Sequence, residues 1–190
     1  MKKNSFILLF FIAITNLAIA QKNNFTLDTK SSSIQWEAKK VIGGHVGTIG
    51  IKDGKIAVDK NKITGGEFTI DMTSLLCTDA PKATDHLKNE DFFHVTKFTT
   101  AKFVITKVDN SKAQPVVTGN LTIKEKTKSI SFPIKVTAIS AQGVEAEASN
   151  IKINRLDYDI RFRSKSLFTD LGDKAIEDEF TLNIKIKATK

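Results

Sequence analysis

The chain has 190 residues, with 29 basic and 21 acidic side chains, a formal net charge of +8 and one cysteine. A single cysteine excludes a disulfide within the chain, so side-chain packing must stabilise the fold. The basic residues are scattered rather than clustered, which argues against a nucleic-acid partner and leaves only transient contact with an anionic membrane surface.

The first twenty residues have the pattern of a secretory signal peptide. Met1–Lys3 is positively charged, the run from Phe6 to Ile14 is apolar, and Ala18–Ala20 has the small-x-small form of a cleavage site. The apolar run is shorter than the roughly 20 residues that a membrane span needs. We therefore expect cleavage before Gln21 and a single mature domain, residues 21–190, in the periplasm or outside the cell.

Alternation of apolar and polar side chains dominates the mature chain. It is clearest in residues 34–39, 68–72, 101–105, 117–123, 130–138 and 180–188. Such one-sided strands are typical of antiparallel sheets with one face in water. Asp53-Gly54, between two short apolar runs, predicts a tight hairpin. Pro133 falls at a polar position of its run, which indicates a sheet edge or a bulge.

One short helix is predicted between strands. It covers Thr84–Asp91, which follows Pro81 and lacks β-branched residues beyond its first position. A turn is expected at 170–174, and Gly43-Gly44 and Gly65-Gly66 fit bends or hairpins. Eight to ten one-sided strands with one helix can bury their apolar faces in a sandwich or in a closed barrel. The alternation alone does not choose between them.

Several segments resemble the YceI-like family in order and spacing, over nearly all of the mature chain. They are Ser33-Ile34-Gln35-Trp36, Phe68 to Leu75, Asp85 to Phe93, Gly119 to Lys124, Lys128 to Pro133, and Ile153 to Tyr158. One departure is visible: many members have a glycine where this chain has Glu125, which leaves the shape of that turn open.

The resemblance implies a closed, antiparallel, up-and-down barrel of about eight strands, lipocalin-like and periplasmic, with an elongated apolar cavity. Some members of the family bind polyisoprenoids or related amphiphiles there. The residues expected to line such a cavity are Ile34, Trp36, Phe68, Ile70, Met72, Phe103, Ile105, Leu121, Ile130, Phe132, Ile134, Phe180, Leu182 and Ile184. The alternative is that these side chains pack into a solid core.

The head of an amphiphile should lie at an open end of the barrel, near polar groups. The candidates are His45, Asp85, His86, Arg155 and Tyr158. Arginine suits an anionic phosphate or carboxylate. An ion pair of Arg155 with Asp157 or Asp159 is an equal alternative, and helix-end hydrogen bonding is the ordinary role for His86.

No catalytic or metal-binding motif is found. The spacings of His45, His86, His94 and Cys77 match no common zinc signature, and Ser74 lies in no nucleophile elbow. Cys77 fits a small buried residue.

We therefore expect non-enzymatic binding or carriage of a hydrophobic amphiphile in the cell envelope, without a metal or cofactor. The amphiphile would be a polyisoprenoid, a quinone-like molecule or a fatty molecule. Two alternatives remain: an interaction module with a filled core, and an accessory to a membrane quinone or cytochrome system. The chain leaves open whether the protein is a monomer or a homodimer.

Overall fold

The computed structural model describes residues 23–190, so the expected leader and its cleavage site lie outside the described residues. The strands are β1 (Asn23–Leu27), β2 (Ser33–Lys40), β3 (Gly44–Asp59), β4 (Lys62–Cys77), β5 (Thr100–Asp109), β6 (Val116–Ile123), β7 (Lys126–Pro133), β8 (Lys135–Ile139), β9 (Gly143–Asn154) and β10 (Ile176–Thr189). The helices are α1 (Pro81–Lys88) and the short 3-10 turns η1 (Arg155–Tyr158) and η2 (Gly172–Lys174). Over the described part of the chain, no helix has the length and apolar character of a membrane span.

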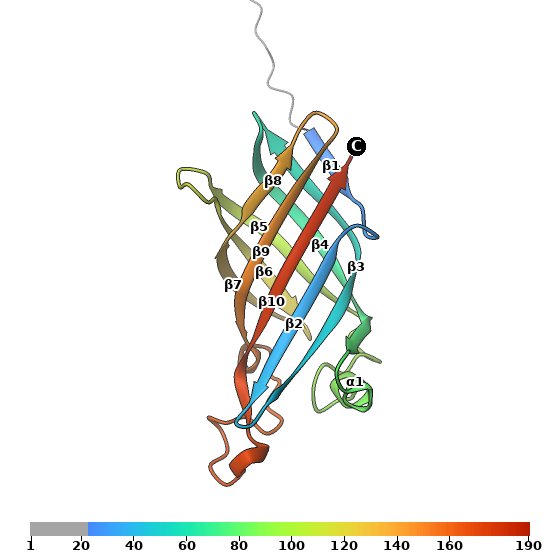
Figure 1. The fold of residues 1–190 in the computed structure, drawn as a ribbon, viewed down its shortest axis with the longest axis vertical. Coiled ribbons are helices and arrows are strands. Elements are labelled where there is room, and N and C mark those ends of the chain that lie inside the picture. The colour runs from blue at the N-terminus through green and yellow to red at the C-terminus, as the bar shows by residue number, and fades with distance from the viewer. Residues whose placement is uncertain (1–22) are drawn as a thin grey trace, which may run out of the picture.

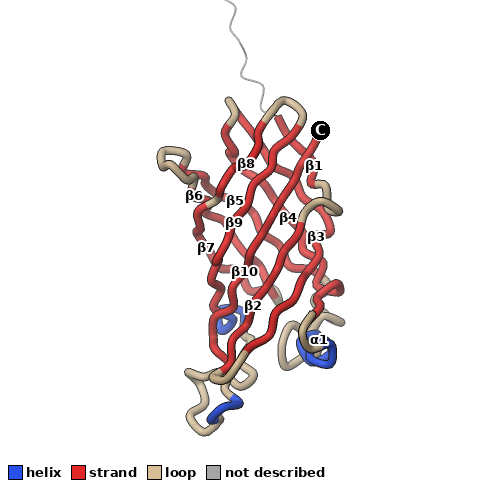
Figure 2. The backbone as a smooth tube through the Cα atoms, viewed as in Figure 1, coloured by secondary structure: helices blue, strands red, loops and turns tan. Residues whose placement is uncertain are grey.

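The strands form one closed antiparallel barrel, as expected (Figure 1). Apart from β1 with β2 and β7 with β8, strands that follow one another in the chain pair in the sheet, which makes the topology up-and-down. β1 and β2 both pair with β3 and β10, and so share one position between them. β7 and β8 follow one another along a second shared position, so the ten strands fill eight positions. The tube is elongated, and α1 and the turns after β9 gather at one end (Figure 2). We call this the helical end.

The barrel closes through a strand that changes partners at Pro133. β7 pairs with β6 as far as Pro133, and β8 then pairs with β9 from Lys135 onward. Proline has no backbone N–H to donate, so the ladder with β6 ends where proline costs least. The N–H of Ile134 donates to Pro115 O at 2.8 Å, directly after this change. Pro133 thus lies at an edge of the β6–β7 ladder, as its position predicted.

The predicted hairpin at Asp53-Gly54 is wrong. These two residues continue β3, opposite Thr69 and Phe68, beside an irregularity in the register after Ile51. A bulge takes up the extra residue without reversing the chain. The reversal comes instead at Lys60-Asn61, where both residues have positive φ as in a type I′ turn. Gly65-Gly66 likewise lies within β4 rather than at a hairpin.

Two further expectations need correction. The helix begins at Pro81 and ends at Lys88, three residues earlier than predicted, with proline in the first turn, where its missing N–H costs nothing. The alternation of residues 130–138 puts Ala138 on the apolar side of its run, together with Ile134 and Val136, and this position is also wrong. A register shift between Val136 and Ala138 turns Ala138 outward, and Ile139 packs against the core in its place.

Three glycines face aromatic rings on the inner wall. Gly47 pairs with Trp36, and a Cβ there would clash with the Trp36 ring and with the carbonyl oxygen of Leu76. A Cβ on Gly54 would lie 2.8 Å from its pairing partner Phe68. A Cβ on Gly119 would clash with the ring of Phe103. The rings can therefore lie flat on the backbone of the neighbouring strand.

We predict that Glu125→Gly stabilises the protein by about 0.5–1 kcal/mol. Lys124 and Glu125 form the β6–β7 turn with φ of 48° and 63°, a conformation that costs a residue with a Cβ about 1–2 kcal/mol. Glycine removes this strain, but it also raises the conformational entropy of the unfolded chain, which offsets part of the gain in stability. Urea unfolding measures the difference.

The matched control is Lys126→Gly, the next residue and the first of β7. Its backbone is extended, so glycine there should destabilise the protein by about 0.5–1 kcal/mol. Equal changes in the free energy of unfolding at both positions would contradict the explanation that the positive φ of Glu125 strains the turn.

Candidate functional site

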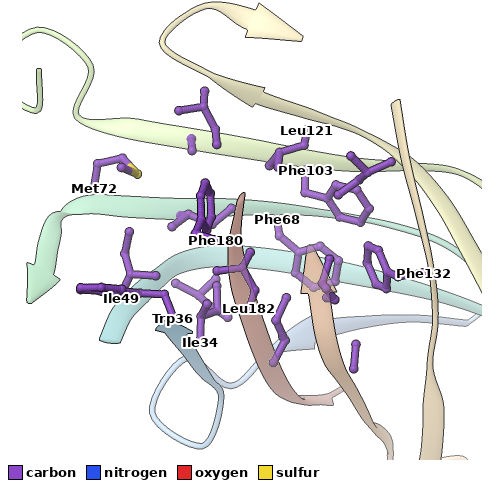
Figure 3. Close-up of a pocket in the computed structure, with 18 of the residues that line it drawn as sticks. Ile34, Trp36, Ile49, Phe68, Met72, Phe103, Leu121, Phe132, Phe180 and Leu182 are labelled. Carbon is purple, nitrogen blue, oxygen red and sulfur yellow. The ribbon is translucent and has the colours of Figure 1, made fainter. Parts of the chain in front are cut away.

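The barrel encloses an apolar cavity along its axis (Figure 3). Its volume is about 200 Å³. One water needs only about 10–15 Å³, so the space greatly exceeds an ordinary packing defect. All residues of the wall are apolar except Glu147, Arg155 and Glu177. The interior is hollow rather than filled.

Every predicted lining residue lies on the cavity wall. From β2, β4, β5, β6, β7 and β10, with one residue between β7 and β8, these are Ile34, Trp36, Phe68, Ile70, Met72, Phe103, Ile105, Leu121, Ile130, Phe132, Ile134, Phe180, Leu182 and Ile184. Figure 3 shows several of these side chains converging from different strands. Their contact with a ligand stays a prediction.

Part of the wall was missed by the sequence analysis. Leu87, Phe92, Phe93 and Ile160 reach the cavity from α1 and from irregular segments, where no alternation identifies an inward side chain. They belong to the helical end, which the strand pattern does not describe. Further strand residues on the wall, including Ile49, Ile51, Ile151 and Ile186, do follow the alternation and could have been found by it.

The three polar residues of the wall have partners. Glu147 pairs with Lys185 at 3.3 Å, and Glu177 pairs with Lys165 at 2.7 Å. Arg155 is bonded within the protein, as described next. An occupant of this cavity would therefore meet hydrocarbon along its length, with no unpaired charge on the wall to orient it.

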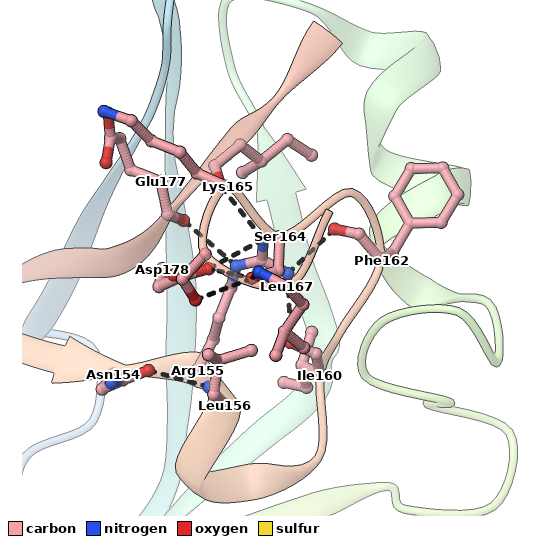
Figure 4. A network of polar contacts seen from close by, with 12 residues as sticks. Asn154, Arg155, Leu156, Ile160, Phe162, Ser164, Lys165, Leu167, Glu177 and Asp178 are labelled. Carbon is pink, nitrogen blue, oxygen red and sulfur yellow. Dashed lines mark hydrogen bonds and ion pairs between the residues drawn. The ribbon is translucent and has the colours of Figure 1, made fainter. Parts of the chain in front are cut away.

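Arg155 is held at the helical end by backbone carbonyl groups (Figure 4). Its side chain is only 5% exposed. The guanidinium donates from Nε to Glu177 O at 3.1 Å, from Nη1 to Ile160 O and Phe162 O, both at 3.0 Å, and from Nη2 to Ile176 O at 3.2 Å. Four of its five N–H groups are thus used by the backbone.

Arg155 does form an ion pair, the alternative to head-group binding, but its partner is Asp178 rather than Asp157 or Asp159. Nη2 of Arg155 lies 3.6 Å from Asp178 Oδ1. Burial raises the pKa of Asp178, but hydrogen bonds from Ser164 and Ser166 and the charge of Arg155 outweigh it, so the pKa is lowered overall. Burial also lowers the pKa of Arg155, and the charge of Asp178 partly opposes this. The pair links the start of η1 to the start of β10.

The other head-group candidates do not line the cavity. His45 lies 3.3 Å from Asp79, and Asp85 is exposed on α1. His86 packs edge-on against Phe92 and Phe162, with Nε2 3.6 Å from Asp91 Oδ2. Tyr158 is buried, and its hydroxyl has no hydrogen-bond partner in the described residues.

Arg161 and Arg163 are cations that the sequence analysis missed. They flank a shallow depression at the helical end, together with Asp91, Phe162 and Phe168. Because they lie in an irregular segment, no periodic pattern distinguishes them.

We predict that Arg155→Gln destabilises the protein by about 3 kcal/mol, because it leaves Asp178 and several carbonyl groups without partners. Urea unfolding followed by the fluorescence of Trp36, the only tryptophan, measures the effect. As control, Arg161→Gln removes an exposed pair with Asp159 and should cost at most about 1 kcal/mol. Unchanged stability with weaker lipid binding would instead make Arg155 a head-group ligand.

We also predict that Tyr158 stays protonated in the folded protein until the pH reaches about 12. Burial, reinforced by the charge of Asp157, raises its pKa from 10.0 to about 12. The pKa of Tyr158 is higher in the folded protein than in the unfolded chain. The protonated side chain therefore contributes fully to the free energy of unfolding below pH 10, and this contribution is lost as the pH rises from about 10 to 12.

Tyrosinate absorbance reports this residue alone, since the chain has one tyrosine. The urea-unfolded chain is the control and should titrate near pH 10. A native titration near pH 10 would show that the hydroxyl is in contact with water.

Comparison with known proteins places this barrel in a family. The YceI-like domain matches residues 25–188. Protein YceI of Salmonella newport (strain SL254) is 23% identical over 189 residues, covering 97% of each chain. BcnA of Burkholderia cenocepacia has a TM-score of 0.70 at 20% identity, over 86% of this chain and 99% of that one. A polyisoprenoid-binding domain of Saccharophagus degradans has a TM-score of 0.63 at 14% identity, over 87% and 97%.

The solved structures share the fold with this chain, and the family match spans nearly all of the described residues. This chain belongs to the YceI-like family.

Proposed function

We propose that this protein binds the apolar chain of a polyisoprenoid or a related amphiphile inside its barrel and carries it, unchanged, in the cell envelope. The observation that carries the proposal is the hollow interior, whose wall is hydrocarbon and whose few polar residues have partners. The name of the polyisoprenoid-binding neighbour supports the chemical class of the ligand. The signal-like residues 1–20 support the envelope as the compartment.

Burial of hydrocarbon is enough to drive such binding. Each methylene transferred from water gains about 0.8 kcal/mol, and association costs roughly 4–15 kcal/mol. A few isoprene units can offset that cost and give micromolar affinity, about −8 kcal/mol, without any polar contact along the tail. The wall selects for apolar character and width rather than for a particular functional group.

The alternative of an interaction module with a solid core is disfavoured by the cavity.

Contact with a membrane surface stays a prediction. Among residues 23–190, six large apolar side chains are exposed. The β2–β3 turn and the 164–175 segment contribute four of them, Val41, Ile42, Leu167 and Phe168. The N–H of Val41 donates to Ala175 O at 3.2 Å, which joins these two segments at the helical end. Such contact would be made there.

Trp36 allows a direct test of binding. It is the only tryptophan and lies on the cavity wall, with Nε1 bonded to Thr48 O at 3.3 Å. A polyprenol that enters the barrel should change its emission in a saturable way, and native mass spectrometry should show the complex. A polyprenol that leaves both the emission and the mass unchanged would refute the proposed function.

We predict that Ile184→Trp lowers polyprenol affinity at least about tenfold while costing less than about 3 kcal/mol of stability. Ile184 lines the cavity opposite Ile34 and Ala148, so a larger side chain takes space from the ligand. The usual cost of overpacking is about 1–3 kcal/mol. Uptake is measured by native mass spectrometry, because the new tryptophan obscures the signal of Trp36.

The matched control is Lys187→Trp, on the same strand, whose side chain is 45% exposed and pairs with Glu145, a residue that does not line the cavity. It should leave affinity unchanged. A larger loss of stability in Ile184→Trp, without a specific loss of binding, would show that the position is packed solid.

A further inference from the structure

A second group of side chains, separate from the cavity, meets beside the start of α1. The ligand atoms of His45, Cys77 and Asp79 all lie within 4.8 Å of one another. Nδ1 of His45 is 3.3 Å from Asp79 Oδ2, and Sγ of Cys77 is 3.1 Å from Asp79 Oδ1. An imidazole, a thiol and a carboxylate thus converge on one point.

Strand register explains why these residues meet although they are far apart in sequence. Cys77 at the end of β4 pairs with Gly47 of β3, and the N–H of Thr78 donates to Val46 O at 2.9 Å. Continuing this antiparallel register places Asp79 opposite His45. Side chains two residues apart share a face of a strand, so Cys77 and Asp79 lie on the same side as His45.

The backbone around the group holds its members in place. The N–H of Val46 donates to Asp79 Oδ1 at 3.1 Å, and the N–H of Cys77 donates to Thr84 Oγ1 at 3.0 Å. Cys77 is fully buried and packs with Trp36 and Leu75. The thiol of Cys77 therefore lies on the interior side of the group, and His45 and Asp79 lie on its solvent side.

The donor set and its spacing suit a borderline divalent cation. Zn²⁺ binds cysteine at about 2.3 Å and histidine or carboxylate at about 2.0–2.2 Å, which sets tetrahedral ligand atoms roughly 3.3–3.7 Å apart. Cys77 Sγ lies 3.1 Å from one carboxylate oxygen of Asp79 and His45 Nδ1 lies 3.3 Å from the other, and both separations are close to this range. The side chains of His45 and Asp79 are 33% and 40% exposed, so an ion and a fourth ligand, water, have access.

We propose that His45, Cys77 and Asp79 form a site for a divalent transition-metal ion of the zinc class. The ion binds the Cys77 thiolate, and the thiol proton passes to solvent. The site joins β3, the end of β4 and the segment that leads into α1. It stands independently of ligand binding in the barrel. These residues match no common zinc signature because such signatures describe ligands that are close together in the sequence, whereas His45 and the Cys77–Asp79 pair come from two different strands.

Cobalt(II) is the probe that tests this site. Untagged protein, freed of metal by a chelator, is titrated with Co²⁺. We expect a thiolate-to-cobalt absorption band that saturates at one equivalent and is lost on addition of Zn²⁺. Cys77→Ser should remove the band, and His45→Gln should weaken Co²⁺ affinity at least about tenfold.

His94→Gln is the matched control, because His94 is a partly buried histidine outside the group, and it should leave the titration unchanged. His45 is partly exposed, so His45→Gln keeps the test valid even if Cys77→Ser fails to fold. A titration without a thiolate band, or one that His45→Gln does not alter, overturns the proposal. The three side chains would then only form hydrogen bonds with one another that hold β3 to the end of β4.

Discussion

Closure of the backbone ladder is the constraint on which the rest of this molecule depends. β10 pairs with the opening strands β1 and β2, so the last strand of the chain joins its first strands. Backbone N–H and C=O groups must find partners when they are removed from water, and the ring of strands pairs most of them, so that only β7 and β8 have a partner strand on one side alone. Closure at eight positions also fixes the radius. An interior of that size either fills with side chains or admits one small ligand, and here space remains.

Much of the wall could be predicted from the sequence because it depends on a local rule. Alternation assigns an inward face wherever a strand stays regular, as it does through Phe180, Leu182 and Ile184. It fails where the register shifts. Asp53-Gly54 has the composition of a turn but lies in a strand, and Ala138 turns outward after a bulge. The hollow itself could not be predicted, since the remaining volume depends on the whole assembly of side chains.

The helical end is joined by cations that bind backbone carbonyl groups. Arg155 donates to four of them, and Lys124 donates from the β6–β7 turn to Phe92 O at 2.9 Å and Asp159 O at 3.4 Å. Irregular segments leave carbonyl groups that no ladder satisfies, and long cationic side chains can reach them. No periodic pattern marks such residues. Arg155 therefore looked in the sequence like a free cation for an anionic head, although most of its donors are used within the protein.

Gly47, Gly54 and Gly119, whose backbones lie beside the rings of Trp36, Phe68 and Phe103, bear on how wide a guest the barrel can admit. A ring that lies over the backbone of a glycine stays close to the barrel wall. A methyl group at the same place would push the ring toward the channel. The bore is therefore set by the absence of three side chains as much as by the presence of others. Alanine at two of these places would also meet a backbone carbonyl oxygen, that of Leu76 at Gly47 and that of Val104 at Gly119, so a relative could narrow the channel there only if its strands moved apart.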